Sequence, residues 1–201
     1  DAFPSLHYSR NSFSTGNDVT VVSELLRCYE TAICLSYEQL KSKLLYVPLD
    51  KIKQVLAQNS SFVWVGTGVY THTSRLEIDL NEWHTIEKKI ETELTERRYV
   101  SLASLNVSAS RELNPELSET AVKNGLFQVY LANQYEKRGN IITPKGTVLN
   151  SVAVLEDYCL THDCLTLDEL FEFEKEINGS VHSQSLLAAY DNMIRVDKDT
   201  F

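Results

Sequence analysis

Several short stretches of the sequence carry basic and amide side chains of the kind that contact nucleic acid. Lysine and arginine neutralise backbone phosphates, and glutamine or asparagine can form two hydrogen bonds with the edge of adenine. The stretches lie at 51–54, 123–128 and 137–145. The candidate contact residues are Lys51, Lys53, Gln54, Lys123, Asn124, Gln128, Lys137, Arg138 and Lys145.

These residues also fit a structural interpretation, in which they form a solvated helix face and a charged hairpin that discourages edge pairing. The overall charge favours this alternative, because the sequence has 28 acidic and 19 basic residues and a net charge of −9. Trp64 and Tyr70 pose the same choice, since they can stack on a base or pack on the core from adjacent strands. Thr67, His72 and Arg75 lie near the same hairpin.

Motifs that carry catalysis are missing from the sequence. It has only seven glycines and contains no glycine-rich phosphate loop, no G-x-S-x-G, no H-E-x-x-H and no EF-hand loop. Five scattered histidines give no pair with metal-ligand spacing. We therefore expect no catalytic residue, no bound metal and no cofactor.

Four cysteines, at positions 28, 34, 159 and 164, sit in apolar runs. We predict that they are small buried hydrophobic residues in a reducing cytoplasm. A disulfide within either close pair is an alternative. A metal site formed by Cys159, His162 and Cys164 is another. A loop histidine between two packed thiols is the simpler interpretation, because no fourth ligand has regular spacing.

A hexamer pattern recurs every 65 residues, at 35–40, 100–105 and 165–170. Each copy reads apolar, Ser or Thr, apolar, two further residues and Leu. The Ser or Thr can cap a helix by accepting a hydrogen bond from a backbone N–H. Gln39 and Glu169 lie three residues after the cap and would complete a capping box. The pattern predicts a short strand followed by a capped helix in each copy.

Further elements surround each hexamer in the same order. An amphipathic helix is expected before each hexamer, at about 19–31, 80–94 and 152–160. A further helix is expected after each hexamer, from Pro48 and at 114–132 and 183–190. A hairpin is expected to close each copy, at 62–71, 135–143 and 193–201. Helix, short strand, helix, helix, strand, turn and strand is the order of a winged helix-turn-helix. The third helix would then carry Lys51 or Lys123 toward a major groove, with the hairpin as the wing.

The predicted fold is therefore mainly α with small β-hairpins (α+β), built as three tandem winged helix-turn-helix modules. The modules are expected at 18–79, 80–150 and 151–201, after a linker or tail of a preceding domain at 1–17. The second module carries about eight extra residues, which we place around 106–114. The third is acidic and is the candidate for truncation.

The module pattern resembles the HARE-HTH superfamily, which includes the winged-helix domain of the bacterial RNA polymerase delta subunit. Leu165-Thr166-Leu167-Asp168-Glu169-Leu170 and the hairpin from Phe62 to Tyr70 carry the resemblance. The resemblance extends over most of the chain, because the pattern occurs in three copies. It implies a cytoplasmic protein of transcription or DNA transactions, although a fold does not by itself fix a function.

Acidic residues are concentrated in the third predicted module. Residues 151–201 hold 11 acidic and 3 basic residues, whereas 80–150 hold 9 of each. Because phosphate neutralisation dominates DNA affinity, we expect duplex DNA to contact modules 1 and 2. We expect module 3 to meet a basic protein surface. The longest apolar runs fall short of the roughly 18 residues that span a membrane, so no membrane partner is expected.

Two functional hypotheses from different classes follow. One is a nucleic-acid-binding or regulatory fragment of a larger protein; the fragment is expected because the chain begins at Asp1 and its single methionine is Met193. The other is a protein-interaction scaffold that makes no direct contact with DNA. A continuous basic stripe through Lys51, Lys53 and the 137–138 pair would favour the first hypothesis.

Overall fold

A computed structural model describes residues 7–9, 12–14 and 19–201. The predicted linker at 1–17 lies mostly outside the described residues. Its described parts form two short antiparallel strands, β1 (His7–Ser9) and β2 (Ser12–Ser14). The chain is mixed α+β and divides into two compact units. The first unit holds Asp1–Glu77 and Ser110–Val129, and the second holds Ile78–Ala109 and Tyr130–Phe201.

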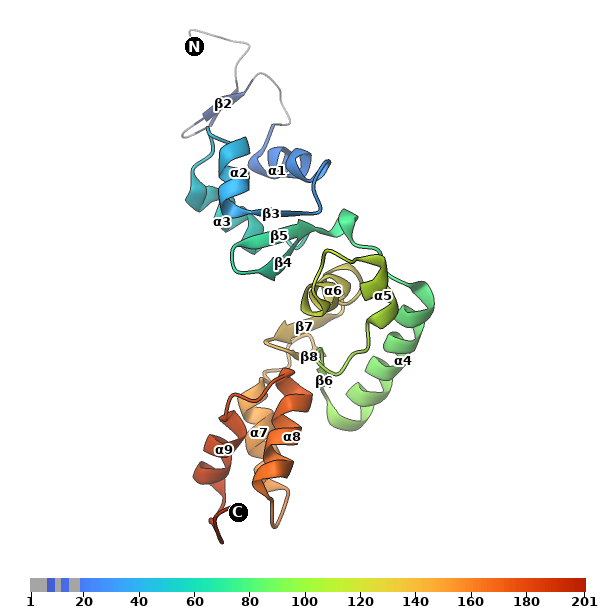
Figure 1. Cartoon of the computed structure of the whole chain (residues 1–201), viewed down its shortest axis with the longest axis vertical. Helices are drawn as coiled ribbons and strands as arrows, with labels where there is room; N and C mark the ends of the chain where they lie inside the picture. Colours follow the sequence, from blue (N-terminus) through green and yellow to red (C-terminus); the bar gives the residue numbers. More distant parts are fainter. Residues whose placement is uncertain (1–6, 10–11, 15–18) are drawn as a thin grey trace. The chain divides into compact units, whose positions relative to one another are not determined.

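The first unit contains three helices and a three-stranded antiparallel sheet within residues 19–77 (Figure 1). The helices are α1 (Val21–Tyr29), α2 (Tyr37–Lys43) and α3 (Leu49–Gln58); the strands are β3 (Cys34–Ser36), β4 (Phe62–Gly66) and β5 (Val69–His72), followed by a 3-10 turn, η1 (Thr73–Arg75). The sheet order β3-β5-β4 places the last strand of the hairpin beside the first strand. The predicted helix–strand–helix–helix–hairpin order is confirmed for this segment.

Local capping fixes where these helices begin. The Ser36 hydroxyl accepts from the Gln39 amide N–H at 3.2 Å, and the Gln39 side chain accepts from the Ser36 N–H at 2.8 Å. The capping box predicted at Ser36 is therefore confirmed. Thr20 and Ser23 form another at the start of α1, which the sequence analysis did not predict.

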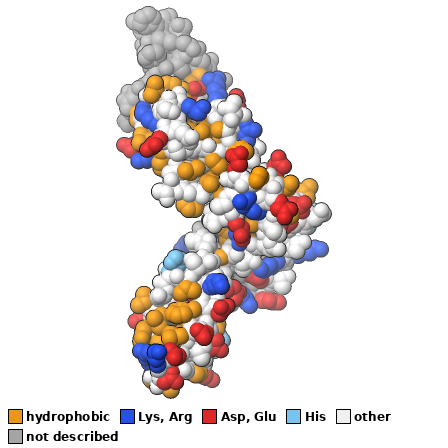
Figure 2. Space-filling view, viewed as in Figure 1, with side chains coloured by type: hydrophobic (Ala, Val, Ile, Leu, Met, Phe, Trp, Pro, Cys, Tyr) orange, Lys and Arg blue, Asp and Glu red, His pale blue; other side chains and the backbone are white. Residues whose placement is uncertain are grey.

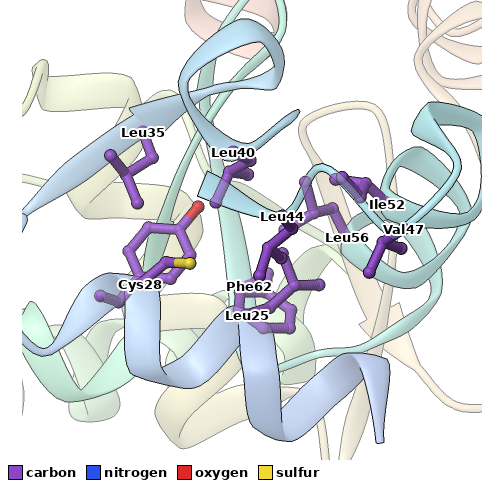
Figure 3. Packing of buried hydrophobic residues seen from close by; sticks show 10 residues of the cluster. Leu25, Cys28, Leu35, Leu40, Leu44, Val47, Ile52, Leu56 and Phe62 are labelled. Carbon is purple, nitrogen blue, oxygen red and sulfur yellow. The ribbon is translucent and has the colours of Figure 1, made fainter. Parts of the chain in front are cut away.

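One apolar face of each helix meets in a common core (Figure 3). Leu25 of α1, Leu40 of α2 and Ile52 of α3 have no exposed surface, and Phe62 of β4 packs with them. Burying each of these side chains contributes about 1.5–3 kcal/mol. This core fixes which side of α3 is left to solvent.

The rest of the first unit covers the sheet with helix α6 (Glu119–Leu126), which packs against β4. The side chain of Ser118 caps α6, and a π-helical turn, η2 (Phe127–Leu131), follows it. Helix α5 (Ser108–Leu113) precedes this segment and occupies the region where an insertion is predicted. Gly125 lies so close to Leu76 that a Cβ atom there would be 2.4 Å from Leu76 Cδ2. The small residue therefore permits the close approach.

The second unit combines a sheet with four helices (Figure 1). Its elements are α4 (Leu80–Arg97), β6 (Val100–Ser101), β7 (Tyr135–Arg138), β8 (Ile141–Pro144), α7 (Ser151–Leu160), α8 (Leu167–Asn178) and α9 (Gln184–Asn192). The antiparallel order β6-β8-β7 has the same connectivity as the sheet of the first unit. The hairpin predicted at 135–143 is confirmed.

The prediction that Ser101 caps a helix is wrong. The Ser101 hydroxyl donates instead to the carbonyl of Ile177 at 2.7 Å and accepts from the Ala103 N–H. Asn140 in the β7–β8 turn donates to the carbonyl of Asn178 at 2.8 Å. These two side chains satisfy the carbonyls that the end of α8 leaves open, so they join the sheet to α8 within the unit.

The closing hairpin predicted at 193–201 is also wrong. Residues 193–196 form no strand in the described part of the chain, and Val196 N–H donates to the Thr200 carbonyl across a tight turn. Thr200 forms a bridge with Thr166, and Leu165 and Phe201 exchange backbone hydrogen bonds. The last residues therefore pair directly with the segment before α8. The capping box of Thr166 and Glu169 is confirmed.

The cysteine prediction holds for two of the four residues. Cys28 and Cys159 are buried, and burial raises the pKa of each thiol. Cys34 is half-buried and Cys164 is exposed, and all four are free thiols. Within the part of the chain that the structure describes, no helix has the length and apolar character needed to cross a membrane.

Candidate nucleic-acid interface

The first candidate set lies on the solvent side of α3. Ile52 and Leu56 turn toward the core, so helical geometry turns Lys51, Lys53 and Gln54 outward, and all three are exposed. The Lys51 ammonium group donates to the Gln54 side-chain oxygen at 3.1 Å. The structure thus brings this predicted set together on one surface.

A row of aromatic rings extends this surface toward the hairpin. The Lys53 ammonium nitrogen lies 5.5 Å from the centre of the Tyr37 ring, and the Tyr37 and Tyr70 ring centres are 5.7 Å apart. Tyr70 is directly paired with Trp64 across β4 and β5. The side chain of Trp64 is 45% exposed. Tyr37, Tyr70 and Trp64 are called the aromatic row below.

Trp64 and Tyr70 differ in their placement, because Tyr70 packs against the buried core cluster of the first unit. Trp64 is exposed, so it does not pack in the core as the structural interpretation expects. Tyr70 is partly buried, and its pKa is raised to about 12 by burial and by the hydrogen bond with Tyr37. Its phenol therefore stays neutral at physiological pH. Tyr37 is not among the candidate residues predicted from the sequence. It directly follows the Ser36 cap, and its backbone N–H donates to Gly68 in the β4–β5 turn.

The geometry of the β4–β5 turn places Tyr37 against the hairpin. Gly68 has φ +71°, a left-handed conformation that favours glycine, and its carbonyl accepts from the Tyr37 N–H at 2.9 Å. A Cβ atom on Gly68 would lie 3.0 Å from Tyr37 Cδ2. The backbone of the turn thus approaches the ring so closely that a side chain at position 68 would require both a strained φ and a shift of the Tyr37 ring.

Two other residues near the β4–β5 hairpin have structural partners. Arg75 of η1 donates to the backbone carbonyls of Tyr29 and Glu30 and so joins the turn after β5 to the end of α1. The His72 Nδ1 lies 2.7 Å from the Ser74 hydroxyl. Burial, with the neighbouring Arg75 charge, lowers the pKa of His72. Thr67 at the tip is exposed.

The second candidate helix is less accessible than predicted. Lys123 is only 8% exposed, and its ammonium nitrogen lies 2.7 Å from the Glu119 carboxylate. Asn124 and Gln128 are half-buried. Helix α6 has eight residues, and four of them besides Lys123 are buried. Because the helix is covered on most sides, even a charged residue in it does not face solvent.

The remaining candidates belong to the second unit. Lys137 is half-buried, and burial lowers its pKa. Arg138 and Lys145 are exposed, and the Arg138 guanidinium is 3.7 Å from the Glu136 carboxylate. The candidates at 123–128 therefore belong to the first unit, and those at 137–145 belong to the second.

No protein-family model matches the sequence, and a search of curated proteins finds no match either. Over the described residues, no group of three or more His, Cys, Asp or Glu side chains is arranged to hold a metal ion. His162 instead places Nδ1 2.8 Å from the Tyr158 carbonyl.

Proposed function

We propose that the chain is a nucleic-acid-binding fragment built from tandem winged-helix modules, and that residues 19–77 make the principal contact with the duplex. In this proposal α3 enters the major groove and the β4–β5 hairpin follows the backbone as a wing. The element order of residues 19–77 and its partial recurrence in 80–144 support the proposal. Such a fragment would serve a protein of transcription or DNA transactions.

The observation that carries the proposal is the continuous surface from α3 to the wing. It joins the two exposed lysines, Lys51 and Lys53, through the aromatic row to exposed Trp64. Cations hold phosphates and Gln54 can read a base edge, while an exposed indole can stack on an unpaired base or lie against a sugar.

The proposal predicts that Lys51→Ala combined with Lys53→Ala weakens duplex binding roughly tenfold or more at low salt. Each lost phosphate contact lowers the slope of log affinity against log salt by about 1, so the slope is expected to fall by about 2. The measurement is fluorescence anisotropy of a labelled random-sequence duplex, titrated with the full chain at several salt concentrations.

A matched control removes the same charge elsewhere. Lys88 and Lys198 are exposed and lie in the second unit, so Lys88→Ala with Lys198→Ala should leave the salt slope within error of the parent chain. An equal loss in both double variants would mean that net charge, not the α3 surface, governs binding. No binding at low salt would end the nucleic-acid proposal for this chain.

A second candidate function, a protein-interaction scaffold, is favoured by a different observation. Hydrophobic side chains gather on the α7–α9 part of the second unit (Figure 2). Ile194 is 86% exposed, and Leu187 and Tyr190 of α9 are also exposed. Contiguous exposed apolar surface is typical of protein-binding sites. Duplex binding that survives the loss of Lys51 and Lys53, or no duplex binding at all, would favour this function.

A further inference from the structure

The second unit contains a cleft that the nucleic-acid proposal does not use. It has a volume of about 790 Å³ and lies between the end of α4, α7 and α8. A neighbouring hollow of about 520 Å³ shares the walls formed by Tyr158, Phe173 and Glu176. Volumes of this size are typical of sites that bind small molecules or several side chains.

The floor of the cleft is apolar and is held in place by stacked rings. The Tyr158 and Phe173 ring centres are 3.7 Å apart with an interplanar angle of 15°. The His162 ring also packs against Tyr158, with 4.3 Å between the two ring centres. Leu149 and Val154 complete the apolar lining. Because these rings support one another, the floor is formed before any partner arrives.

The edge of the cleft carries more negative than positive charge. Glu176 is neutralised by Arg97, whose guanidinium nitrogen is 3.1 Å from its carboxylate. Glu96 and Asp157 also line the cleft, are exposed and form no ion pair among the described residues. The adjoining hollow adds Glu172, which is exposed and similarly unpaired over the described chain. Lys175 and Arg98 are the opposing cations.

The surrounding charge has the same sign, since residues 151–201 contain 11 acidic and 3 basic residues. An anionic ligand would meet repulsion on approach, and a cationic one would be attracted. We propose that this cleft binds a cationic peptide segment, with apolar side chains on the Tyr158–Phe173 floor and an arginine or lysine beside Glu96 and Asp157. This binding is independent of the nucleic-acid surface in the first unit.

The test uses the full chain and two fluorescein-labelled peptides, each with three repeats of one sequence. The cationic probe repeats Arg-Ala-Leu-Gly, and the anionic probe repeats Glu-Ala-Leu-Gly. We expect the cationic peptide to raise the anisotropy on titration and the anionic one to leave it unchanged. Glu96→Gln with Asp157→Asn should weaken binding of the cationic peptide roughly fivefold, through the loss of two partly exposed charge contacts.

The matched control is Glu91→Gln with Glu156→Gln. These exposed acids lie on the same two helices, α4 and α7, but outside the cleft, so removing them changes net charge equally. Binding in the control is expected to stay within twofold of the parent chain. An equal loss in both double variants would overturn the proposal in favour of bulk electrostatics, and so would a cationic peptide that does not bind.

A steric variant separates the apolar floor from the charged edge. Ala153 lines the cleft on α7, so Ala153→Trp should fill it without changing the charge. We expect this variant to weaken binding of the cationic peptide at least as much as Glu96→Gln with Asp157→Asn does. Duplex binding is expected to be unchanged. A far-ultraviolet circular dichroism spectrum matching that of the parent would show that it folds. Peptide binding at parental affinity in a folded Ala153→Trp chain would overturn the proposal.

Discussion

Replacing Glu174 by alanine is expected to lower the free energy of unfolding of the second unit by about 3 kcal/mol or more. The Glu174 carboxylate is completely buried and accepts from the backbone N–H groups of His182 and Gln184, each at 2.9 Å. It also accepts from the Ser185 hydroxyl at 2.7 Å. Alanine would leave these donors without their acceptor, and among them the Ser185 hydroxyl is buried. Urea denaturation followed by circular dichroism measures the cost.

The size of this effect follows from how α9 begins. The residue before the helix, Ser183, has φ +60°, and within the described chain its own side chain does not cap α9. Glu174 on α8 supplies the missing acceptor from another helix, so one carboxylate both caps α9 and joins it to α8. Glu172→Ala, an exposed change on the same helix, should cost no more than about 0.5 kcal/mol. Equal losses in the two variants would contradict the capping role.

The pH dependence of stability provides a second readout of the same contact. Burial alone would raise the pKa of Glu174, but the hydrogen bonds from Ser185, Gln184 and His182 outweigh it, and the pKa is lowered. A carboxylate whose pKa is lower in the folded state stabilises the protein above its unfolded pKa of about 4.3. That contribution is lost as the pH falls through the folded pKa. The parent chain should therefore lose stability on acidification, and the difference in unfolding free energy between it and the Glu174→Gln variant should become smaller.

Local sequence patterns predicted the caps that have partners three residues away. Ser36 with Gln39 and Thr166 with Glu169 are confirmed because both halves of each capping box lie in one short segment. Ser101 occupies the same place in its hexamer, but no helix begins after it in the described chain before Ser108. Its hydroxyl bonds to Ile177, which is 76 residues away. A partner at that separation leaves no trace in the local pattern.

The exposure of individual side chains was predicted less well than the caps. It depends on where the helices that pack on the sheet begin and end. Alternation along β4 places Phe62 and Trp64 on the same face of the sheet. Phe62 is buried by the helices, whereas Trp64 lies two residues further along and is left exposed. Lys123 shows the reverse case. Its pattern indicated a solvent-facing contact residue, but α6 is buried on most sides and Glu119 neutralises the charge.

Asn114, a residue of the first unit that precedes α6 in the sequence, has a hydrogen-bonded side chain and is only 6% exposed. Its amide nitrogen donates to the carbonyls of Glu77 and Ser110, each at 2.6 Å. Its side-chain oxygen accepts from the Glu77 N–H at 3.1 Å. The side chain therefore pairs with both backbone groups of Glu77 and joins the segment after β5 to the one that precedes α6.

Asn114→Asp is expected to lower the free energy of unfolding of the first unit by about 3 kcal/mol. The carboxylate has the same shape, but it removes two donors and places negative charge against the carbonyls of Glu77 and Ser110. Hydrogen exchange should then accelerate at the backbone amides of α6, and urea denaturation should give the energy. Asn106→Asp is the matched control, because Asn106 is exposed and only accepts a hydrogen bond, from the Ser108 N–H. Unchanged α6 exchange in Asn114→Asp would mean that apolar packing alone holds α6 on the sheet.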